Sequence, residues 1–295
     1  MNKQNHCCQS VQKPCTQGNI ILSRIAISIC LGVLPINAFA GKADIRAANN
    51  QIRLQTISTN VDYTETGNGM LGSKTGVLDT ETGPVGGYAL SVTNMKDVWL
   101  GNDYFEFSYD YSRGNTTYTG SYQGGTYGSV VTSSKAVLTN YTARYGSGVV
   151  LHEKFMLTPY LELANHEWYR GVNYGEIYSH YHLGIGVLAQ YSPVNRLVLS
   201  AYAMLGNTFG SYITVVSGPG LTGFAGSLGN ASLYRAGLSA DFAFAKNLHG
   251  NVGIEYMSFN YGISGVYDVG GGYVAWEPDS KTNYTTVKLG LGYAF

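Results

Sequence analysis

Apolar and polar side chains alternate along most of this chain. At its end, apolar residues occupy every second position: Val287, Leu289, Leu291, Tyr293 and Phe295. Small residues and Lys288 fill the positions between them. Successive side chains of a β-strand point to opposite faces, so a period of two predicts a strand with one apolar face.

The same alternation predicts ten strands, at residues 51–65, 86–95, 103–114, 129–145, 155–170, 176–191, 196–210, 232–245, 251–262 and 282–295. Short connections (95–102, 146–154, 192–195 and 246–250) alternate with connections that, apart from the brief 171–175, are long or Gly-rich (66–85, 115–128, 211–231 and 262–281). Eight strands is the alternative, because the first strand has a mixed phase. Its Ile52 and Leu54 lie on the opposite face from Ile57, Val61 and Tyr63.

The first 40 residues predict a secretory signal peptide. An apolar run of ten residues, Ile25 to Leu34, follows a basic region and precedes Ala38-Phe39-Ala40, a small-x-small cleavage pattern. Ten residues are too few to span a bilayer as a helix, which needs about 20. We therefore expect cleavage after Ala40 and one mature domain at residues 41–295.

Composition narrows the class of protein. Only 12% of residues are charged, against roughly 25% in ordinary domains. The chain is rich in Gly (39) and Tyr (25), and its net charge of zero gives no reason to expect a nucleic-acid partner. All four cysteines precede residue 31, so the mature chain has no disulfide. An exported chain of this kind is a soluble β-sandwich or a β-barrel.

The faces of the strands favour the barrel. A sandwich would expose Lys and Glu on its polar face, whereas the polar faces here carry Gly, Ser, Thr and charges of both signs. Such residues suit a narrow lumen. The apolar faces carry Leu, Val and Ala at mid-strand and Tyr or Phe near strand ends, as in a lipid-facing band between aromatic girdles. We predict an all-β fold: a single antiparallel transmembrane β-barrel.

The chain resembles bacterial outer-membrane β-barrels, in particular small barrels of the opacity-protein and OmpA-like kind. The resemblance rests on the signal peptide, the alternating loop lengths and the final strand that ends in Phe295. It implies that the barrel-assembly machinery recognises Val287, Leu289, Leu291, Tyr293 and Phe295. It also implies a location in the bacterial outer membrane and contact with membrane lipid and lipopolysaccharide. We expect both termini to be periplasmic, because the number of strands is even. It implies no reaction.

Alternation turns a set of titratable side chains inward: Asp62, Glu106, Asp110, Arg144, Glu162, Arg170, His180, His182, Arg235, Asp241, Glu255 and Lys288. About ten strands make a narrow barrel, far below the 16–18 of open porins. We expect these groups to form a charge-paired network that fills the lumen. The alternative is a narrow porin or solute channel lined by them.

The inward histidines raise the possibility of chemistry. His180, His182, Glu162 and His166 together could hold a metal or act in acid–base catalysis. Some outer-membrane barrels are proteases or lipid A esterases, but their Asp-x-Asp and Ser–His patterns are not recognisable near the outer rim. We expect hydrogen-bonding histidines, no catalysis, no cofactor and no metal. A barrel hydrolase is the least favoured function.

The long connections are the remaining candidates for function. Asn115 to Ser129 (NTTYTGSYQGGTYGS) is a hairpin tip that could bind a surface ligand, or a solvated extension of two strands. Asp79 and Glu81 could form a weak calcium site, but an acidic loop facing water is favoured. Trp168 and Trp99 fit the outer and inner aromatic belts. We therefore predict a structural or adhesive surface protein.

Overall fold

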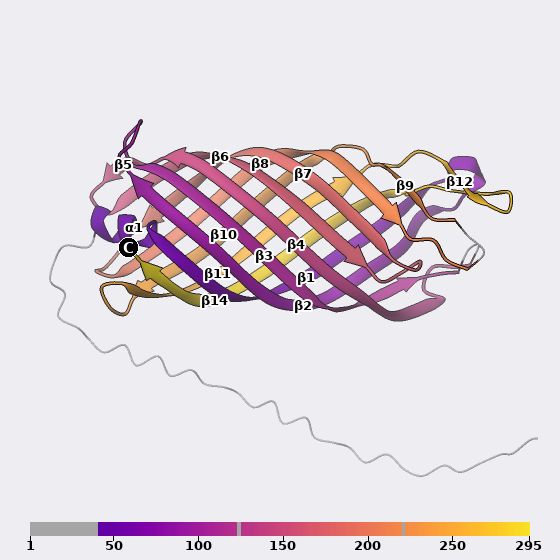
Figure 1. Ribbon diagram of the computed structural model, residues 1–295, viewed down its shortest axis with the longest axis horizontal. Helices are drawn as coiled ribbons and strands as arrows, with labels where there is room; N and C mark the ends of the chain where they lie inside the picture. The colour runs from indigo at the N-terminus through magenta and orange to yellow at the C-terminus, as the bar shows by residue number, and fades with distance from the viewer. Residues whose placement is uncertain (1–40, 123–124, 220–221) are drawn as a thin grey trace, which may run out of the picture. The chain divides into compact units, whose positions relative to one another are not determined.

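The computed structural model describes residues 41–122, 125–219 and 222–295, so the predicted signal peptide lies outside the described residues. Ten long antiparallel strands form the wall of a barrel (Figure 1). They are β1 Gln51–Asn68, β2 Thr75–Lys96, β3 Asp103–Gly120, β4 Val130–Ser147, β6 Phe155–Arg170, β7 Glu176–Tyr191, β8 Leu197–Val215, β10 Ser232–Ala243, β11 Leu248–Tyr261 and β14 Asp279–Ala294.

Every long strand pairs with a neighbour on each side, so the barrel is closed. The last strand, β14, pairs with β1 from Gln51↔Ala294 to Thr66↔Asp279. The ladder continues on its other edge through β11 and β10 to β8. The prediction of a ten-stranded antiparallel barrel is confirmed, and the eight-stranded alternative is wrong. Closure leaves no long edge open, which is why the final strand does not fray.

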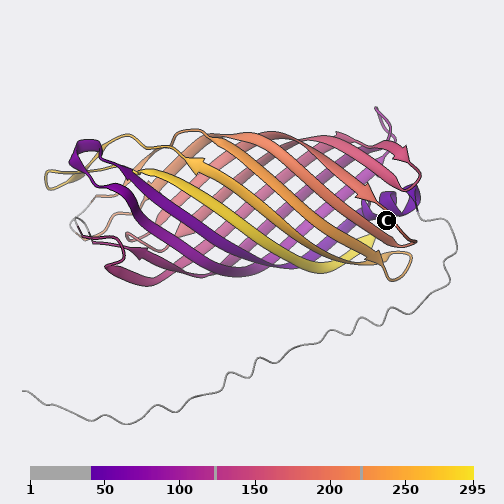
Figure 2. The same ribbon diagram turned by 180° about the vertical axis from the view of Figure 1, so that it is seen from behind.

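Short elements occupy the two ends of the barrel (Figures 1 and 2). Helix α1, Lys42–Ala48, lies at the end where the chain stops, and the Phe295 amide donates to the Asn50 carbonyl there (3.1 Å). We call this the termini end and the opposite one the loop end. The other short elements are β5 Val149–His152, β9 Phe224–Ser227, β12 Tyr267–Gly270, β13 Tyr273–Ala275 and the 3₁₀ turn η1 Met70–Gly72.

Strands β1, β2 and β3 run further toward the loop end than the alternation predicts. Strand β2 has 22 residues and β3 has 18. A strand needs only about 9–11 residues to cross a bilayer. Much of the predicted 66–85 and 115–128 connections is therefore strand, and β1 to β4 extend well beyond the length that a membrane requires.

The outer wall is apolar. Large side chains such as Leu183, Ile185 and Leu205 point outward and keep 55%, 68% and 70% of their surface exposed. This is the opposite of a water-soluble core and matches a lipid-facing wall. No helix in the described parts of the chain is long and apolar enough to cross a membrane.

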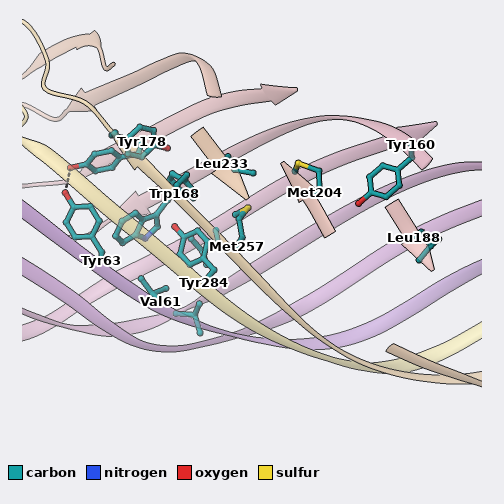
Figure 3. Close-up of a cluster of buried hydrophobic side chains, with 14 of the residues drawn as sticks. Val61, Tyr63, Tyr160, Trp168, Tyr178, Leu188, Met204, Leu233, Met257 and Tyr284 are labelled. Carbon is teal, nitrogen blue, oxygen red and sulfur yellow. Dashed lines mark hydrogen bonds between the residues drawn. The ribbon is translucent and has the colours of Figure 1, made fainter. Parts of the chain in front are cut away.

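The loop half of the interior is packed with aromatic rings (Figure 3). Trp168 is fully buried, 5.2 Å from the Tyr63 ring and stacked 5.8 Å from the Tyr178 ring. The assignment of Trp168 to an outer belt was therefore wrong. It shares the inward phase of β6 with His166 and Arg170. Trp99 lies 80% exposed in the β2–β3 turn at the termini end, so its place in the inner belt stays a prediction.

Candidate functional site

A fully buried charge near the middle of the lumen is the Glu162 carboxylate on β6. It receives Arg144 Nε at 2.6 Å, Arg235 Nη1 at 2.7 Å and His182 Nε2 at 3.0 Å. These groups come from β4, β10 and β7, so they approach from both sides of the lumen. Burying the carboxylate is tolerable because every charge near it has a partner.

This cluster continues across the barrel. Arg144 also pairs with Glu106 on β3 (3.3 Å), and Arg235 pairs with Glu255 on β11 (2.7 Å). A neighbouring pair joins Lys288 on β14 to Asp110 on β3 (2.7 Å). We call these residues the central network: Glu106, Asp110, Arg144, Glu162, His182, Arg235, Glu255 and Lys288.

Aromatic rings support the central network. The Arg144 guanidinium lies 4.6 Å from the Tyr202 ring and 5.1 Å from the Tyr160 ring. The Tyr202 hydroxyl donates to Glu255, and the Tyr104 hydroxyl donates to Glu106. These contacts fix the long Arg side chains, so the network is a packed layer rather than a set of mobile charges.

A second layer of histidines and aromatic rings lies on the loop side of the central network. His180 Nδ1 is 2.7 Å from the Tyr261 hydroxyl, and His166 Nδ1 is 2.6 Å from Asn140 Oδ1. The Phe259 ring packs edge-on against both imidazoles, with centroids 4.7 and 5.4 Å away. The histidines are thus buried among aromatic rings, with 1% of His166 and 0% of His180 exposed.

A third layer closes the loop end. Arg170 pairs with Glu81 (2.8 Å), Glu176 (3.0 Å) and Asp79 (3.2 Å). Its guanidinium lies over the Tyr63 ring at 4.2 Å. Asp79 and Glu81 are therefore buried ion-pair partners on β2, and both expectations for them, a calcium site and a water-facing loop, were wrong.

At the termini end, α1 caps the lumen. Gln51 Nε2 donates to Asp241 (3.2 Å), and His249 Nδ1 lies 2.5 Å from Asp241 Oδ1. Asn49 and Gln190 exchange two side-chain hydrogen bonds of 2.6 and 3.0 Å. A polar cavity of about 140 Å³ separates this cap from the central network, and a cavity of about 20 Å³ lies behind Arg235.

Of the predicted lumen residues, Asp62 is misplaced. It is exposed on the outer surface, where Asn283 Nδ2 donates to it (3.3 Å). An inward Asp62 requires Val61 and Tyr63 on the outer face, but both lie inside the barrel with no exposed surface, whereas Leu54 points outward at 61% exposure. The other eleven members face the lumen, with Arg170 in the third layer and Asp241 at the cap.

Several interior residues were missed. The β2 carboxylates could have been found by continuing the phase of Ala89 and Ser91 back to Asp79, across a Gly- and Pro-rich stretch. His249 could likewise have been found by continuing the phase of β11 backward from Asn251. Glu277 lies in a loop, and no periodic signal points to it.

The lumen offers no ready metal centre. Across the described residues, no three or more His, Cys, Asp and Glu side chains are arranged to hold a metal ion. His166, His180 and His182 are near one another, but their ring nitrogens contact Asn140, Tyr261 and Glu162.

Comparisons with known proteins bear on the fold. No family model and no curated protein sequence matches the chain. The outer membrane protease OmpT from Escherichia coli is similar in structure, with a TM-score of 0.54 and 10% sequence identity over 83% of this chain and 95% of that chain. The chain has the fold of a bacterial outer-membrane β-barrel.

Two other barrels align over similar lengths. Neisserial surface protein A has 9% identity and a TM-score of 0.31, covering 83% of this chain and 97% of that chain. OprG from Pseudomonas aeruginosa has 13% identity and a TM-score of 0.31, covering 84% and 98%.

Proposed function

We propose that this protein resides in the bacterial outer membrane, with its loop end outside the cell and α1 in the periplasm. The apolar outer wall and the longer connections at the loop end support this orientation. A test compares Val274→Cys in β13 with Leu151→Cys in β5, both exposed and at opposite ends. A membrane-impermeant maleimide should label only Val274→Cys on intact cells; labelling of Leu151→Cys instead would reverse the orientation.

We further propose that the protein acts as a structural or adhesive surface protein whose function lies in its loops. The carrying observation is the central network, in which Glu162 joins Arg144 and Arg235 from opposite sides of the lumen. With ion pairs and rings filling the barrel, little room is left for a solute. Exposed aromatic side chains at the loop end, such as Tyr122 (79%) and Tyr174 (62%), are suited to contact a partner.

Liposome swelling with small sugars tests the closed lumen. Vesicles that contain the folded barrel should swell no faster than empty vesicles. Swelling that depends on solute size would instead support a channel.

A narrow channel is the second candidate function. The polar cavity of about 140 Å³ beneath α1 favours it, because charged groups line that cavity. Removal of residues 42–48 distinguishes the two candidates. If α1 gates a channel, the deletion variant should make liposomes swell. If the central network closes the barrel, the deletion variant should cause no swelling.

We propose no enzymatic activity, although OmpT is a protease. His180 and His182 retain 0% and 2% of their surface exposure, so an external substrate cannot reach either ring. Hydrolysis of a broad peptide or ester library by the purified barrel, lost on His180→Ala, would overturn this proposal.

A further inference from the structure

The last outer connection inserts a carboxyl group into the mouth of the barrel. Glu277 lies between β13 and β14, outside the strands, yet only 5% of its surface is exposed. The Tyr178 hydroxyl donates to Glu277 Oε1 at 2.5 Å, and the Tyr63 hydroxyl lies 3.3 Å from the same oxygen. The Glu277 amide donates to Ser264 Oγ (2.7 Å), which ties both ends of this connection together.

The mouth holds more negative than positive charge. Five carboxyl groups surround the Arg170 guanidinium there: Glu65, Asp79, Glu81, Glu176 and Glu277. Arg170 directs its ion pairs to Asp79, Glu81 and Glu176. Glu277 and Glu65 are reached by tyrosine hydroxyls instead. Like charges this close cannot all be ionised without a large repulsion.

The two tyrosine hydroxyls at the mouth have few protons to donate. Each tyrosine hydroxyl has one proton to donate. The Tyr178 hydroxyl lies near both Glu277 and Glu176 (3.3 Å), and the Tyr63 hydroxyl lies 3.3 Å from both Glu277 and Glu65. Glu176 already accepts from Arg170 Nη1 (3.0 Å) and Asn173 Nδ2 (2.8 Å), so the two hydroxyl protons serve Glu277 and Glu65. These two carboxyl groups are thus held by neutral hydroxyls, and a proton on one of them relieves the repulsion at the mouth.

We propose that Glu277 is a proton-operated latch, which holds residues 262–278 in the barrel mouth when protonated and releases them when ionised. The titratable and charged groups that face it are Tyr63 and Glu65 from β1, Asp79 from β2, Arg170 from β6, and Glu176 and Tyr178 from β7. Only Arg170 among them is a cation.

The direction of the pH response follows from the two states. In the closed state burial raises the pKa of Glu277 to about 8, and the Glu176 carboxyl adds to the rise. A released glutamate has an ordinary pKa of about 4.3. The closed state therefore holds the proton more tightly. Closure is strongest below about pH 4.3, weakens by up to about tenfold per pH unit as the pH rises toward 8, and changes little above that.

Distances between two spin labels test the latch directly. No cysteine follows Cys30, so labels can be placed on Val274→Cys in β13 and Val131→Cys in β4, both of them exposed. In the folded, full-length mature barrel we expect one narrow distance distribution at pH 5. At pH 9 the fraction at that distance should fall at least tenfold, with a longer, broader population replacing it.

Two variants test whether Glu277 causes the response to pH. Glu277→Gln keeps the acceptor for Tyr178 but cannot ionise, so it should stay closed at pH 9. Asp268→Asn removes an exposed carboxylate from β12 and should respond like the wild type. Equal wild-type distances at pH 5 and pH 9, or opening of Glu277→Gln at pH 9, would overturn the proposal. The wild-type distances at pH 5 and pH 9 test the latch even if a variant fails to fold. This test does not depend on what the loops bind.

Discussion

Glu162 on β6 lies directly opposite Arg144 on β4, and their side chains form a buried ion pair of 2.6 Å. On its other side Arg144 lies directly opposite Glu106 on β3. Strand register thus places a row of alternating charges along one wall of the lumen. Arg235 from β10 then reaches Glu162 from across the barrel. The register of β3, β4 and β6 aligns the charges on one wall of the lumen. The long Arg235 side chain then closes the lumen from the other wall.

Removal of Glu162 should destabilise the barrel strongly. Glu162→Ala leaves Arg144 and Arg235 buried without their shared partner, so we expect a loss of about 3–5 kcal/mol in the free energy of unfolding. Urea unfolding in detergent, followed by tryptophan fluorescence, measures it. Asp62→Ala is the matched control and should change stability by less than about 0.5 kcal/mol, because Asp62 is exposed. Equal losses in the free energy of unfolding for Glu162→Ala and Asp62→Ala would contradict the central role of Glu162 in the network.

The seam between β14 and β1 depends on a glycine. A Cβ at Gly290 would lie 2.2 Å from the Leu54 carbonyl oxygen, which is backbone and cannot move aside cheaply. Gly290→Ala should therefore cost about 1–3 kcal/mol through strain at the closure. The folded fraction, read from heat-modifiable gel migration, should drop. Gly86→Ala, where the new Cβ would meet open space, should fold like the wild type.

Replacing Trp168 or Trp99 with alanine should change the free energy of unfolding by very different amounts. Trp168 is fully buried among Tyr63, Tyr178 and Arg170, so Trp168→Ala should cost about 3–5 kcal/mol. Trp99 is 80% exposed, so Trp99→Ala should have little effect on unfolding in detergent. If both tryptophans belonged to membrane belts, the two losses would be similar.

The C-terminal residue tests the proposed assembly signal. Phe295→Ala should lower the amount of barrel inserted into the outer membrane of cells, because the final strand would lose its terminal aromatic side chain. Phe244→Ala is the control, since Phe244 is also exposed near the termini end (58% against 55%). Equal amounts of the two variants in outer-membrane fractions would argue against a signal at Phe295.

Alternation was enough to find the barrel, because most strands have one clearly apolar face. Strands β6 and β7 begin and end where the pattern placed them, at 155–170 and 176–191. Their inner faces, with Glu162 on one and His180 and His182 on the other, were assigned correctly for the same reason.

Alternation failed where both faces of a strand carry apolar residues. Near the loop end of β1 the interior is apolar, so the apolar side chains Val61 and Tyr63 face inward and Asp62 faces outward, the reverse of what alternation predicts. Only the pairing of β1 with β2 and β14 fixes which face is inside. The position of Glu277 depends on the fold of a loop and on contacts with β1 and β7, which no local pattern encodes.

Single-channel conductance in a planar bilayer tests the closed lumen most directly. The wild type and Glu106→Ala should be compared after heat-modifiable migration has shown that both are folded. We expect the wild type to carry no steady current, because the central network and the rings behind it fill the barrel. A steady, pore-sized current in the wild type that changes in Glu106→Ala would contradict this account and establish a conducting lumen.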